Sequence, residues 1–335
     1  MKALMVKAPN EAMIVDIPQP TAMAGDAILR VRMVGMCGSD LTTFRGKNPM
    51  VSYPRVLGHE VAATVLEPGS SGVMIGSNVA VLPYTSCGRC ASCRKGKTNA
   101  CQHNQTMGVQ RDGAMTEFLS VPGEKLYPAN LSLQELALVE PLTVGAHAVA
   151  RGRVEAEDIV AVFGCGGVGL GAISAAAFRG ATVIAIDVSD IKLEIARKAG
   201  ATYLIHSGRE DLHARLAQIT EGHGPDVVIE AIGSPLTFRA AVEEVAFAGR
   251  VVYIGYAKEE VAYETRLFVQ KELDIMGSRN ALPEDFREVI HMLEAGSFPV
   301  EDTISVTVPL ADAPRVLADW NESPEKFTKI LVEVG

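Results

Sequence analysis

Short apolar runs separated by glycine and proline fill the first part of the chain. The clearest are Ile28–Val34, Val61–Leu66 and Asn78–Leu82, and Met1–Lys7 has the same texture. Runs of this length bounded by turn residues are typical of strands. Residues 1 to about 140 are therefore predicted to be rich in β-structure.

From about residue 148 the pattern alternates between strands and helices. The predicted strands are Ile159–Phe163, Thr182–Ile186, Val227–Glu230 and Arg250–Ile254, and the predicted helices are 168–179 and 191–199. This alternation predicts βαβ units around a parallel sheet, and hence an α/β fold class. The residues from Pro283 add a helix and a last strand, 329–334, which are expected to return to the first domain. Domain boundaries are expected after residues 145 and 282.

Composition narrows the classes of function. The 335 residues are 48% hydrophobic and 21% charged, as in an ordinary globular chain of about two domains. A net charge of −9 is a poor match for a polyphosphate, so no nucleic-acid partner is expected. The N-terminus lacks a secretory signal, and glycines interrupt the uncharged stretch 159–178. We therefore expect a cytoplasmic chain with no membrane partner.

A glycine-rich turn follows the strand that ends at residue 163. Gly164-Cys-Gly-Gly-Val-Gly169 opens a predicted helix, and Asp187 ends the next strand, roughly 20 residues on. The glycines let backbone N–H groups approach a pyrophosphate, and Asp187 can accept hydrogen bonds from a ribose. Its carboxylate would repel a 2'-phosphate, and residues 188–190 include no arginine, so NAD is expected rather than NADP. The predicted cofactor contacts are Gly164, Gly166, Gly167, Val168, Gly169, Asp187, Lys192 and Val144.

Four of the six cysteines lie within fifteen positions, and they are Cys87, Cys90, Cys93 and Cys101. A disulfide framework fits poorly in a chain of this length without an export signal. Four thiolates complete a tetrahedral zinc and leave no open position. A structural zinc lobe is therefore predicted at about residues 84–104. Free cysteines and a nucleic-acid zinc ribbon are the weaker alternatives, since a ribbon usually pairs two separated knuckles.

Three short segments carry a second set of side chains that bind metals. Cys37-Gly-Ser-Asp40 and Gly58-His-Glu60 precede the cysteine lobe, and Glu140-Pro-Leu follows it. Each is unremarkable alone, because a single histidine is more often packed than bound to a metal. Together they offer a thiolate, an imidazole and a carboxylate in a chain that also has a dinucleotide turn.

The order of these segments resembles the zinc-containing medium-chain dehydrogenases over essentially the whole chain. Glu140-Pro-Leu-Thr-Val-Gly-Ala-His147 resembles the sorbitol and threonine dehydrogenase branch, and Tyr53-Pro-Arg-Val-Leu-Gly-His-Glu60 resembles the polyol and sugar-acid members. The resemblance implies a GroES-like, β-rich catalytic domain and a Rossmann cofactor domain with a doubly wound parallel sheet. It also implies a homodimer or a homotetramer.

The resemblance further implies a catalytic zinc bound by Cys37, His59 and a glutamate, which makes two zinc ions per chain with the structural one. Glu60 and Glu140 are both candidates for the third ligand. One carboxylate makes the zinc site formally neutral, whereas two make it negative and weaken the Lewis acid. We therefore hypothesise that the two glutamates alternate, one binding zinc directly and the other through water.

The implied chemistry is hydride transfer from a secondary alcohol to NAD. Zinc polarises the substrate hydroxyl, Ser39 accepts its proton, and Asp40 orients the ring of His59 from behind. Many relatives have a histidine five residues after the ligand cysteine, where this chain has Thr42. Threonine is not a base near neutral pH, so the outer proton relay needs another group and the pH optimum is expected to shift upward.

The substrate contacts are less well defined. Arg279 follows a predicted strand and turn that lead to the substrate cleft in the sorbitol-type branch, although a surface ion pair explains it equally well. Tyr53 and Asn280 are further candidates. Aromatic residues make up only 5% of the chain, which favours a polar substrate.

The expected function is therefore zinc- and NAD-dependent oxidation of a small polyhydroxylated substrate, namely a polyol, a sugar or an aldonate. The alternative is the same chemistry on a 2,3-diol or an amino alcohol such as threonine. A binding or redox-sensing protein that only keeps the dinucleotide fold is a different class, and such proteins typically lack the metal ligands that this chain has.

Overall fold

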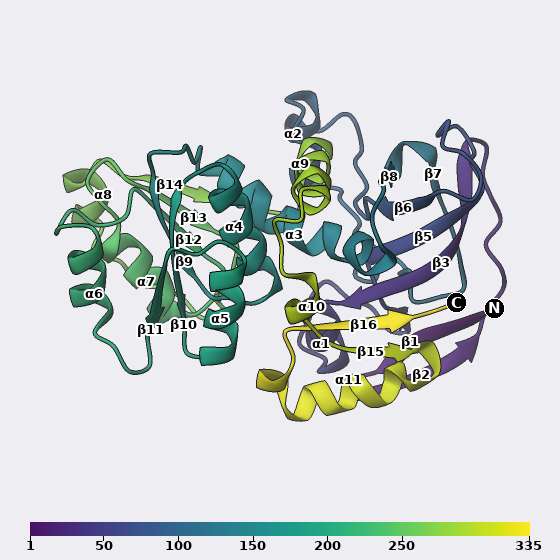
Figure 1. The fold of residues 1–335 in the computed structure, drawn as a ribbon. Coiled ribbons are helices and arrows are strands. Elements are labelled where there is room, and N and C mark those ends of the chain that lie inside the picture. The colour runs from purple at the N-terminus through teal and green to yellow at the C-terminus, as the bar shows by residue number, and fades with distance from the viewer. The chain divides into compact units, whose positions relative to one another are not determined.

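The computed structural model describes all 335 residues, which separate into two compact units (Figure 1). Unit 1 comprises residues 1–140, 282–290 and 300–335, and unit 2 comprises residues 141–281 and 291–299. The boundaries expected from the sequence lay after residues 145 and 282. None of the helices combines the length and the apolar character that crossing a membrane requires.

Unit 1 is built on mostly antiparallel strands. Its larger sheet has the order β15-β16-β3-β5-β6-β8, with β7 also paired to β3. The strands of this sheet are β3 (Asp26–Met36), β5 (Glu60–Glu67), β6 (Asn78–Val81), β7 (Phe118–Pro122), β8 (Leu126–Pro128), β15 (Ile304–Pro309) and β16 (Lys329–Glu333). A smaller sheet has the order β2-β1-β4, formed by Glu11–Asp16, Lys2–Ala8 and Arg55–Val56.

Alternating side chains of these strands form the core of unit 1. Leu29, Val31, Val61 and Val65 all belong to one buried cluster, to which the C-terminal Ile330 also contributes. The final strand β16, yellow in Figure 1, pairs with β3 near the other end of the chain. The C-terminal segment is therefore part of the sheet that carries the candidate metal ligands.

Four helices lie entirely within unit 1. They are α1 (Gly38–Phe44), α2 (Ala91–Arg94), α10 (Val300–Thr303) and α11 (Ala313–Glu322), and single 3-10 turns also occur in this unit. Helices α3 (Leu133–Arg151) and α9 (Pro283–Glu294) begin in unit 1 and continue into unit 2.

Unit 2 contains a six-stranded parallel sheet in the order β11-β10-β9-β12-β13-β14. Its strands are β9 (Ile159–Phe163), β10 (Thr182–Asp187), β11 (Tyr203–His206), β12 (Val227–Glu230), β13 (Arg250–Tyr253) and β14 (Asp274–Gly277). In Figure 1, α4 (Gly167–Phe178) and α5 (Asp190–Lys198) lie on one face, and α6 (Leu212–Ile219), α7 (Pro235–Glu244) and α8 (Arg266–Gln270) lie on the other. The predicted α/β class with a doubly wound parallel sheet is confirmed.

The helix boundaries in unit 2 differ slightly from those predicted. Helix α5 begins at Asp190, one residue earlier than predicted, because the Ser189 side chain caps it by accepting a hydrogen bond from the Lys192 N–H. Helix α4 begins at Gly167, and no side chain caps it. Its first N–H groups therefore have no partner within the helix.

Candidate active site and cofactor site

Three predicted metal ligands come together where β3 meets β5. Cys37 follows the end of β3 and precedes α1, while His59 and Glu60 stand at the start of β5. These two strands are antiparallel neighbours, with Gly35 paired to Glu60. The Cys37 sulfur, a ring nitrogen of His59 and a carboxylate oxygen of Glu60 all lie within 4.8 Å of one another.

Asp40 holds the two ligand-bearing loops together through their backbones. Its carboxylate accepts hydrogen bonds from the N–H of Cys37 at 2.9 Å and from the N–H of Gly58 at 3.4 Å. The structure shows no hydrogen bond from Asp40 to the ring of His59, whose Nδ1 is buried without a hydrogen-bond partner, and that Asp40 orients this ring from behind stays a prediction. Asp40 instead fixes His59 through the adjoining backbone.

Glu140 lies near the cluster but outside the group of three. It is buried, and the hydroxyl of Tyr84 donates a hydrogen bond to its Oε1. Burial raises the pKa of the Glu140 carboxyl, and burial together with the Glu140 charge raises that of the Tyr84 hydroxyl. Sequence reasoning missed Tyr84, because a tyrosine that follows a strand gives no local signal of this contact.

Glu60 has a partner that the sequence did not suggest. The ammonium group of Lys329, on β16, lies 2.6 Å from each oxygen of Glu60. Burial disfavours the charge on Lys329, but the negative charges of Glu60, Cys37 and Glu140 together raise its pKa. A lone lysine in an apolar strand resembles an edge or surface residue in the sequence, and only the pairing of β16 with β3 brings it here.

The donor set and its charge fit a divalent zinc ion. A thiolate, an imidazole and a carboxylate are zinc ligands, and three of them leave one position open, as in catalytic sites. Burial disfavours a charge on His59, but Cys37 and Glu140 raise the pKa of His59 well above its ordinary value. The cluster therefore favours a positive charge.

Ser39 Oγ, two residues from Cys37, is also buried without a hydrogen-bond partner.

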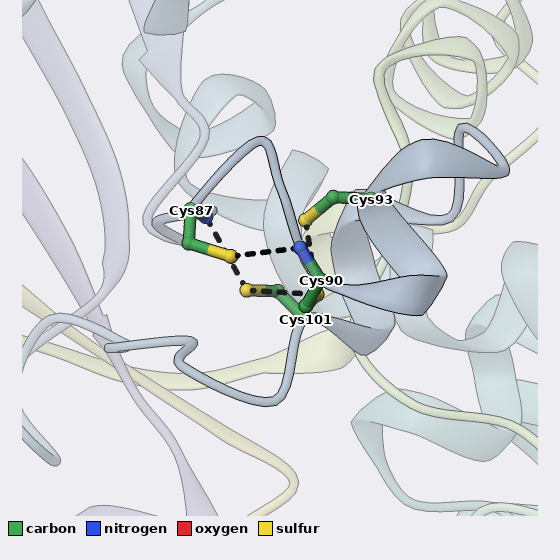
Figure 2. A group of neighbouring side chains, drawn as sticks. All are labelled: Cys87, Cys90, Cys93 and Cys101. Atoms are coloured by element: carbon green, nitrogen blue, oxygen red, sulfur yellow. Dashed lines mark hydrogen bonds between the residues drawn. The ribbon is translucent and has the colours of Figure 1, made fainter.

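The four cysteines of the lobe form a second group of possible ligands. Figure 2 shows their sulfur atoms turned toward one another, and all four lie within 4.8 Å. No disulfide joins them. The Cys87 sulfur accepts from the N–H of Cys90 at 3.4 Å, and the Cys101 sulfur accepts from the N–H of Cys87 and of His103 at 3.3 Å. A hydrogen bond with Ser92 lowers the pKa of Cys90 to about 5. This arrangement fits a closed tetrahedral zinc site.

In unit 2, the glycine turn joins β9 to α4. Gly164 has a φ of +95°, and its N–H donates to the carbonyl of Ile186 at 2.8 Å. A Cβ on Gly169 would lie 1.8 Å from the carbonyl oxygen of Gly164, whereas one on Gly166 would meet no atom within 4 Å. Gly169 is therefore required for packing, and Gly166 faces open space. The predicted contacts Gly167 and Val168 form the uncapped first turn of α4.

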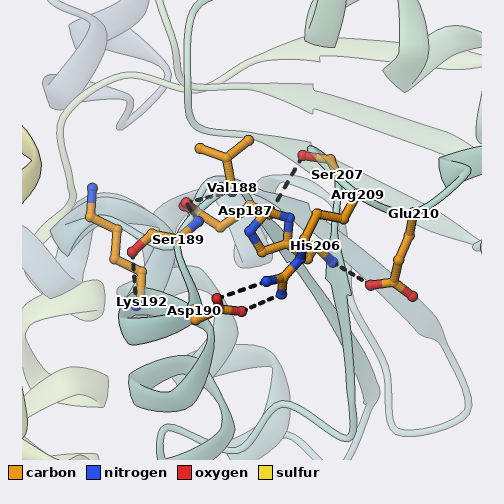
Figure 3. A network of polar contacts seen from close by, with 9 residues as sticks. All are labelled: Asp187, Val188, Ser189, Asp190, Lys192, His206, Ser207, Arg209 and Glu210. Atoms are coloured by element: carbon orange, nitrogen blue, oxygen red, sulfur yellow. Dashed lines mark hydrogen bonds and ion pairs between the residues drawn. The ribbon is translucent and has the colours of Figure 1, made fainter.

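Asp187 is held in place at the end of β10. Its carboxylate accepts from the N–H of Cys165 in the glycine turn at 2.8 Å, and from the N–H groups of Val188 and Ser189 at 2.7 and 3.0 Å. Figure 3 shows Asp187 with the half-buried Lys192, whose side chain extends away from the neighbouring ion pair. These contacts fix a carboxylate beside the turn, as ribose recognition requires.

An arginine that is distant in sequence lies near Asp187 in the structure (Figure 3). Arg209, in the turn after β11, pairs through both guanidinium nitrogens with Asp190 (Figure 3). Residues 188–190 do lack an arginine, but the parallel pairing of β10 and β11 places residues about 20 positions apart in the same region. The guanidinium group of Arg209 is therefore engaged in an ion pair with Asp190.

The remaining predicted contacts have varied surroundings. Val144 lies half-buried on α3. At the adjoining Gly145, an added Cβ would lie 2.2 Å from the backbone nitrogen of Ala172 in α4, so the two helices are in close contact there. The Tyr53 hydroxyl donates a hydrogen bond to the carbonyl of Thr43, so its donor is already engaged by a residue of unit 1. Arg279 and Asn280 follow β14 in unit 2 and are both half-buried. The Thr42 hydroxyl donates to the carbonyl of Ser39 at 3.0 Å.

Comparison with known proteins decides the family. The Alcohol dehydrogenase GroES-like domain matches residues 23–131, and the Zinc-binding dehydrogenase family matches residues 167–295. L-galactonate-5-dehydrogenase of Escherichia coli K12 is 34% identical over 314 residues, which cover 93% of this chain and 92% of that protein. The chain belongs to the zinc-containing medium-chain dehydrogenases. Sorbitol dehydrogenases are further relatives, and the chain falls in this polyol-like branch.

Solved structures of this family include complexes with nicotinamide cofactors. The NADH complex of the alcohol dehydrogenase RspB from E. coli CFT073 has a TM-score of 0.92 at 30% identity, covering 100% of this chain and 99% of that one. An NADP-bound zinc-binding dehydrogenase from Sinorhizobium meliloti 1021 has a TM-score of 0.92 at 28% identity, with 99% of each chain covered. As a family member, the chain is an alcohol oxidoreductase.

Proposed function

We propose that the chain oxidises a secondary alcohol of a polyol, a sugar or an aldonate and transfers the hydride to NAD, with one catalytic and one structural zinc ion. The observation that carries the proposal is the group of half-buried Cys37 with buried His59 and Glu60, whose ligand atoms lie within 4.8 Å of one another. Two segments of unit 1 outside the cysteine lobe therefore supply a site that the relatives' zinc chemistry would use.

When bound, zinc would lower the pKa of the substrate hydroxyl and NAD would accept the hydride. The chain's own residues orient the substrate and move the proton. Ser39 Oγ is buried and without a protein partner, so it is placed to accept a hydrogen bond from the substrate hydroxyl and to relay its proton by giving up its own hydroxyl proton at the same time. The reaction balances when this proton passes on to solvent and the C–H bond delivers its electron pair as hydride.

The outer proton route does not use Thr42. Its hydroxyl is engaged by the carbonyl of Ser39, and a threonine hydroxyl is not a base near neutral pH. The proton would therefore leave Ser39 through water, or through a hydroxyl that bound NAD would supply.

NAD is favoured over NADP by two features of unit 2. The carboxylate of Asp187 is fixed beside the glycine turn and would repel a 2'-phosphate. The nearby guanidinium of Arg209 is paired with Asp190, so it does not offset that repulsion. Val188, which follows Asp187, and Ile191, in the first turn of α5, are 66% and 75% exposed, which suits contact with the apolar faces of an adenine ring.

The substrate class is supported by the relatives and by the composition. L-galactonate-5-dehydrogenase acts on an aldonate, and aromatic residues, which would line a pocket for apolar alcohols, make up only 5% of this chain. Arg279 and Asn280 are proposed to bind substrate hydroxyls or a carboxylate. Tyr53 is the weaker candidate, because its hydroxyl already bonds to Thr43.

The test is NAD reduction, followed by absorbance, across panels of polyols, aldoses and aldonates. Threonine and 2,3-butanediol form a second panel, and NADP replaces NAD in a parallel arm. We expect turnover in the first panel with NAD, and its loss after incubation with a zinc chelator. Turnover confined to the second panel would favour the alternative, while chelator-resistant turnover would reject the zinc mechanism.

A further inference from the structure

Two carboxylates follow β10, and one guanidinium group lies beside them. Arg209 donates two hydrogen bonds to the carboxylate of Asp190, one of them at 3.0 Å (Figure 3). Asp190 is the first residue of α5 and stands three positions after Asp187 in the chain. The guanidinium is therefore bound by the acid that is not expected to touch the ribose.

The carboxylate of Asp187 is held by neutral groups instead. The backbone N–H groups of Cys165, Val188 and Ser189 donate to it at 2.8, 2.7 and 3.0 Å. These donors fix the position of the carboxylate without cancelling its charge. A carboxylate that keeps its full charge accepts hydrogen bonds from ribose hydroxyls more strongly, and it repels a 2'-phosphate more strongly.

The turn that carries Arg209 is fastened next to Asp187 by the backbone. His206 is the partner of Asp187 in the register of β10 and β11, and the N–H of Ser207 donates to the carbonyl of Asp187 at 3.0 Å. Glu210 closes the turn, because its carboxylate accepts from the N–H of His206 at 2.7 Å. With the backbone fixed in this way, a change of partner by the guanidinium needs only a rotation of the arginine side chain.

The ion pair between Arg209 and Asp190 is open to solvent, since their side chains are 61% and 67% exposed. Exposed ion pairs are weak and exchange partners readily, because water and salt screen them. The hydrogen bond from Arg209 lowers the pKa of Asp190, so the pair forms with a charged carboxylate. Removal of the Asp190 charge should therefore free the guanidinium and leave the turn in place.

We propose that Asp190 is a specificity-determining residue of the cofactor site, because its pairing with Arg209 keeps the guanidinium away from Asp187. The carboxylate of Asp187 then stays available to the ribose hydroxyls of NAD, and Arg209 is held back from the 2'-phosphate of NADP. Arg209 is in this sense a latent phosphate-binding group. The proposal rests on the proposed use of NAD and names a second acid that maintains it.

The test measures the binding of NADH and NADPH to the full-length protein without substrate, through the change in cofactor fluorescence. Asp190→Asn removes the charge that holds Arg209 and keeps the shape of the side chain. The freed guanidinium then competes with the ribose hydroxyls for Asp187, or pairs with a 2'-phosphate. We expect the Kd for NADPH to fall by about tenfold and the Kd for NADH to rise by about threefold.

Two further variants show whether the effect depends on Arg209. In the double variant Asp190→Asn with Arg209→Met, both Kd values should return to within about twofold of the wild type. Glu194→Gln is the matched control, because it removes a carboxylate that pairs through both oxygens with Arg197 on the same helix. It should leave both Kd values unchanged, although it alters the net charge by the same amount.

The outcomes separate the possible roles. Unchanged Kd values in Asp190→Asn, at a melting temperature close to that of the wild type, would overturn the proposal. Tighter binding of NADPH that persists in the double variant, or that Glu194→Gln also produces, would overturn it too, because the loss of charge alone would then be the cause. Binding is measured without turnover, so a lack of alcohol oxidation would reject the proposed function alone. A wild type that binds NADPH more tightly than NADH would reject the proposed cofactor and this proposal together.

Discussion

The metal cluster of unit 1 and the glycine turn of unit 2 are built in opposite ways. The cluster consists of the side chains of Cys37, His59 and Glu60, which stand at the end of β3 and the start of β5, and the pairing of these strands brings them together. The glycine turn consists of the backbone of one segment, and its essential feature is the lack of side chains at Gly166 and Gly169. The first site should therefore fail when atoms are removed, and the second when atoms are added.

The largest expected effect follows from removing one ligand of the cluster. Cys37→Ser takes away the soft ligand of the proposed catalytic zinc, and with it several kcal/mol of transition-state stabilisation, so kcat should fall by about a thousandfold or more. Metal analysis should then show one zinc per chain instead of the proposed two. A variant that retains both metal and activity would remove Cys37 from the site.

The cysteine lobe sharpens the comparison, because it is a metal site built from neighbours in sequence. Cys101→Ser opens a site that contributes folding energy, so the free energy of unfolding should fall by roughly 3 kcal/mol or more. Activity per folded molecule should fall far less than in Cys37→Ser. Calorimetry and zinc content check this. Equal activity losses in both variants would mean that the lobe is part of the reactive site.

In the glycine turn, two matched substitutions each add one methyl group. Gly169→Ala places a Cβ 1.8 Å from the carbonyl oxygen of Gly164, so the free energy of unfolding should fall by about 3 kcal/mol. Gly166→Ala meets no protein atom within 4 Å and should leave the stability without cofactor unchanged. It should weaken NAD binding by about tenfold, since the methyl group takes the space of the phosphates. Unchanged NAD affinity in Gly166→Ala would place the pyrophosphate elsewhere.

Asp187, which bonds to the glycine turn, is the exception in unit 2, because there the proposed cofactor contact is made by a side chain. Asp187→Asn removes a charged acceptor worth about 1.5–3 kcal/mol, so the Kd for NAD should rise by about 10- to 100-fold. Discrimination against NADP should fall as the repulsion is lost. Titration of the variant with both cofactors measures these effects. An unchanged ratio of the two affinities would show that another group selects the cofactor.

The smallest effect is expected at Thr42, which lies beside the cluster without belonging to it. Thr42→Val removes one hydrogen bond to the Ser39 carbonyl, which is worth about 1 kcal/mol, and kcat should change by no more than about threefold. The pH–rate profile should keep its shape. A large shift in the profile would instead place Thr42 on the proton route.

The sequence by itself determined everything that depends on neighbours along the chain. The alternation after residue 148 predicted the parallel sheet, and the spacing of the four lobe cysteines and of the glycine turn defined two local groups whose geometry the structure bears out. The resemblance to the dehydrogenase family also named Cys37 and His59 and left Glu60 and Glu140 open as the third ligand, and the structure groups Glu60 with the first two. Local patterns of this kind survive in the sequence, since backbone geometry links nearby residues.

Only the tertiary structure decided what surrounds those side chains. Lys329 lies 269 positions from Glu60 in the chain and contacts it because β16 pairs with β3. Asp40 bonds to two backbone N–H groups instead of the imidazole, Tyr84 bonds to Glu140, and Arg209 is held by Asp190. Burial gives these contacts their strength, and burial depends on which distant strands and loops pack together. No local pattern records that packing.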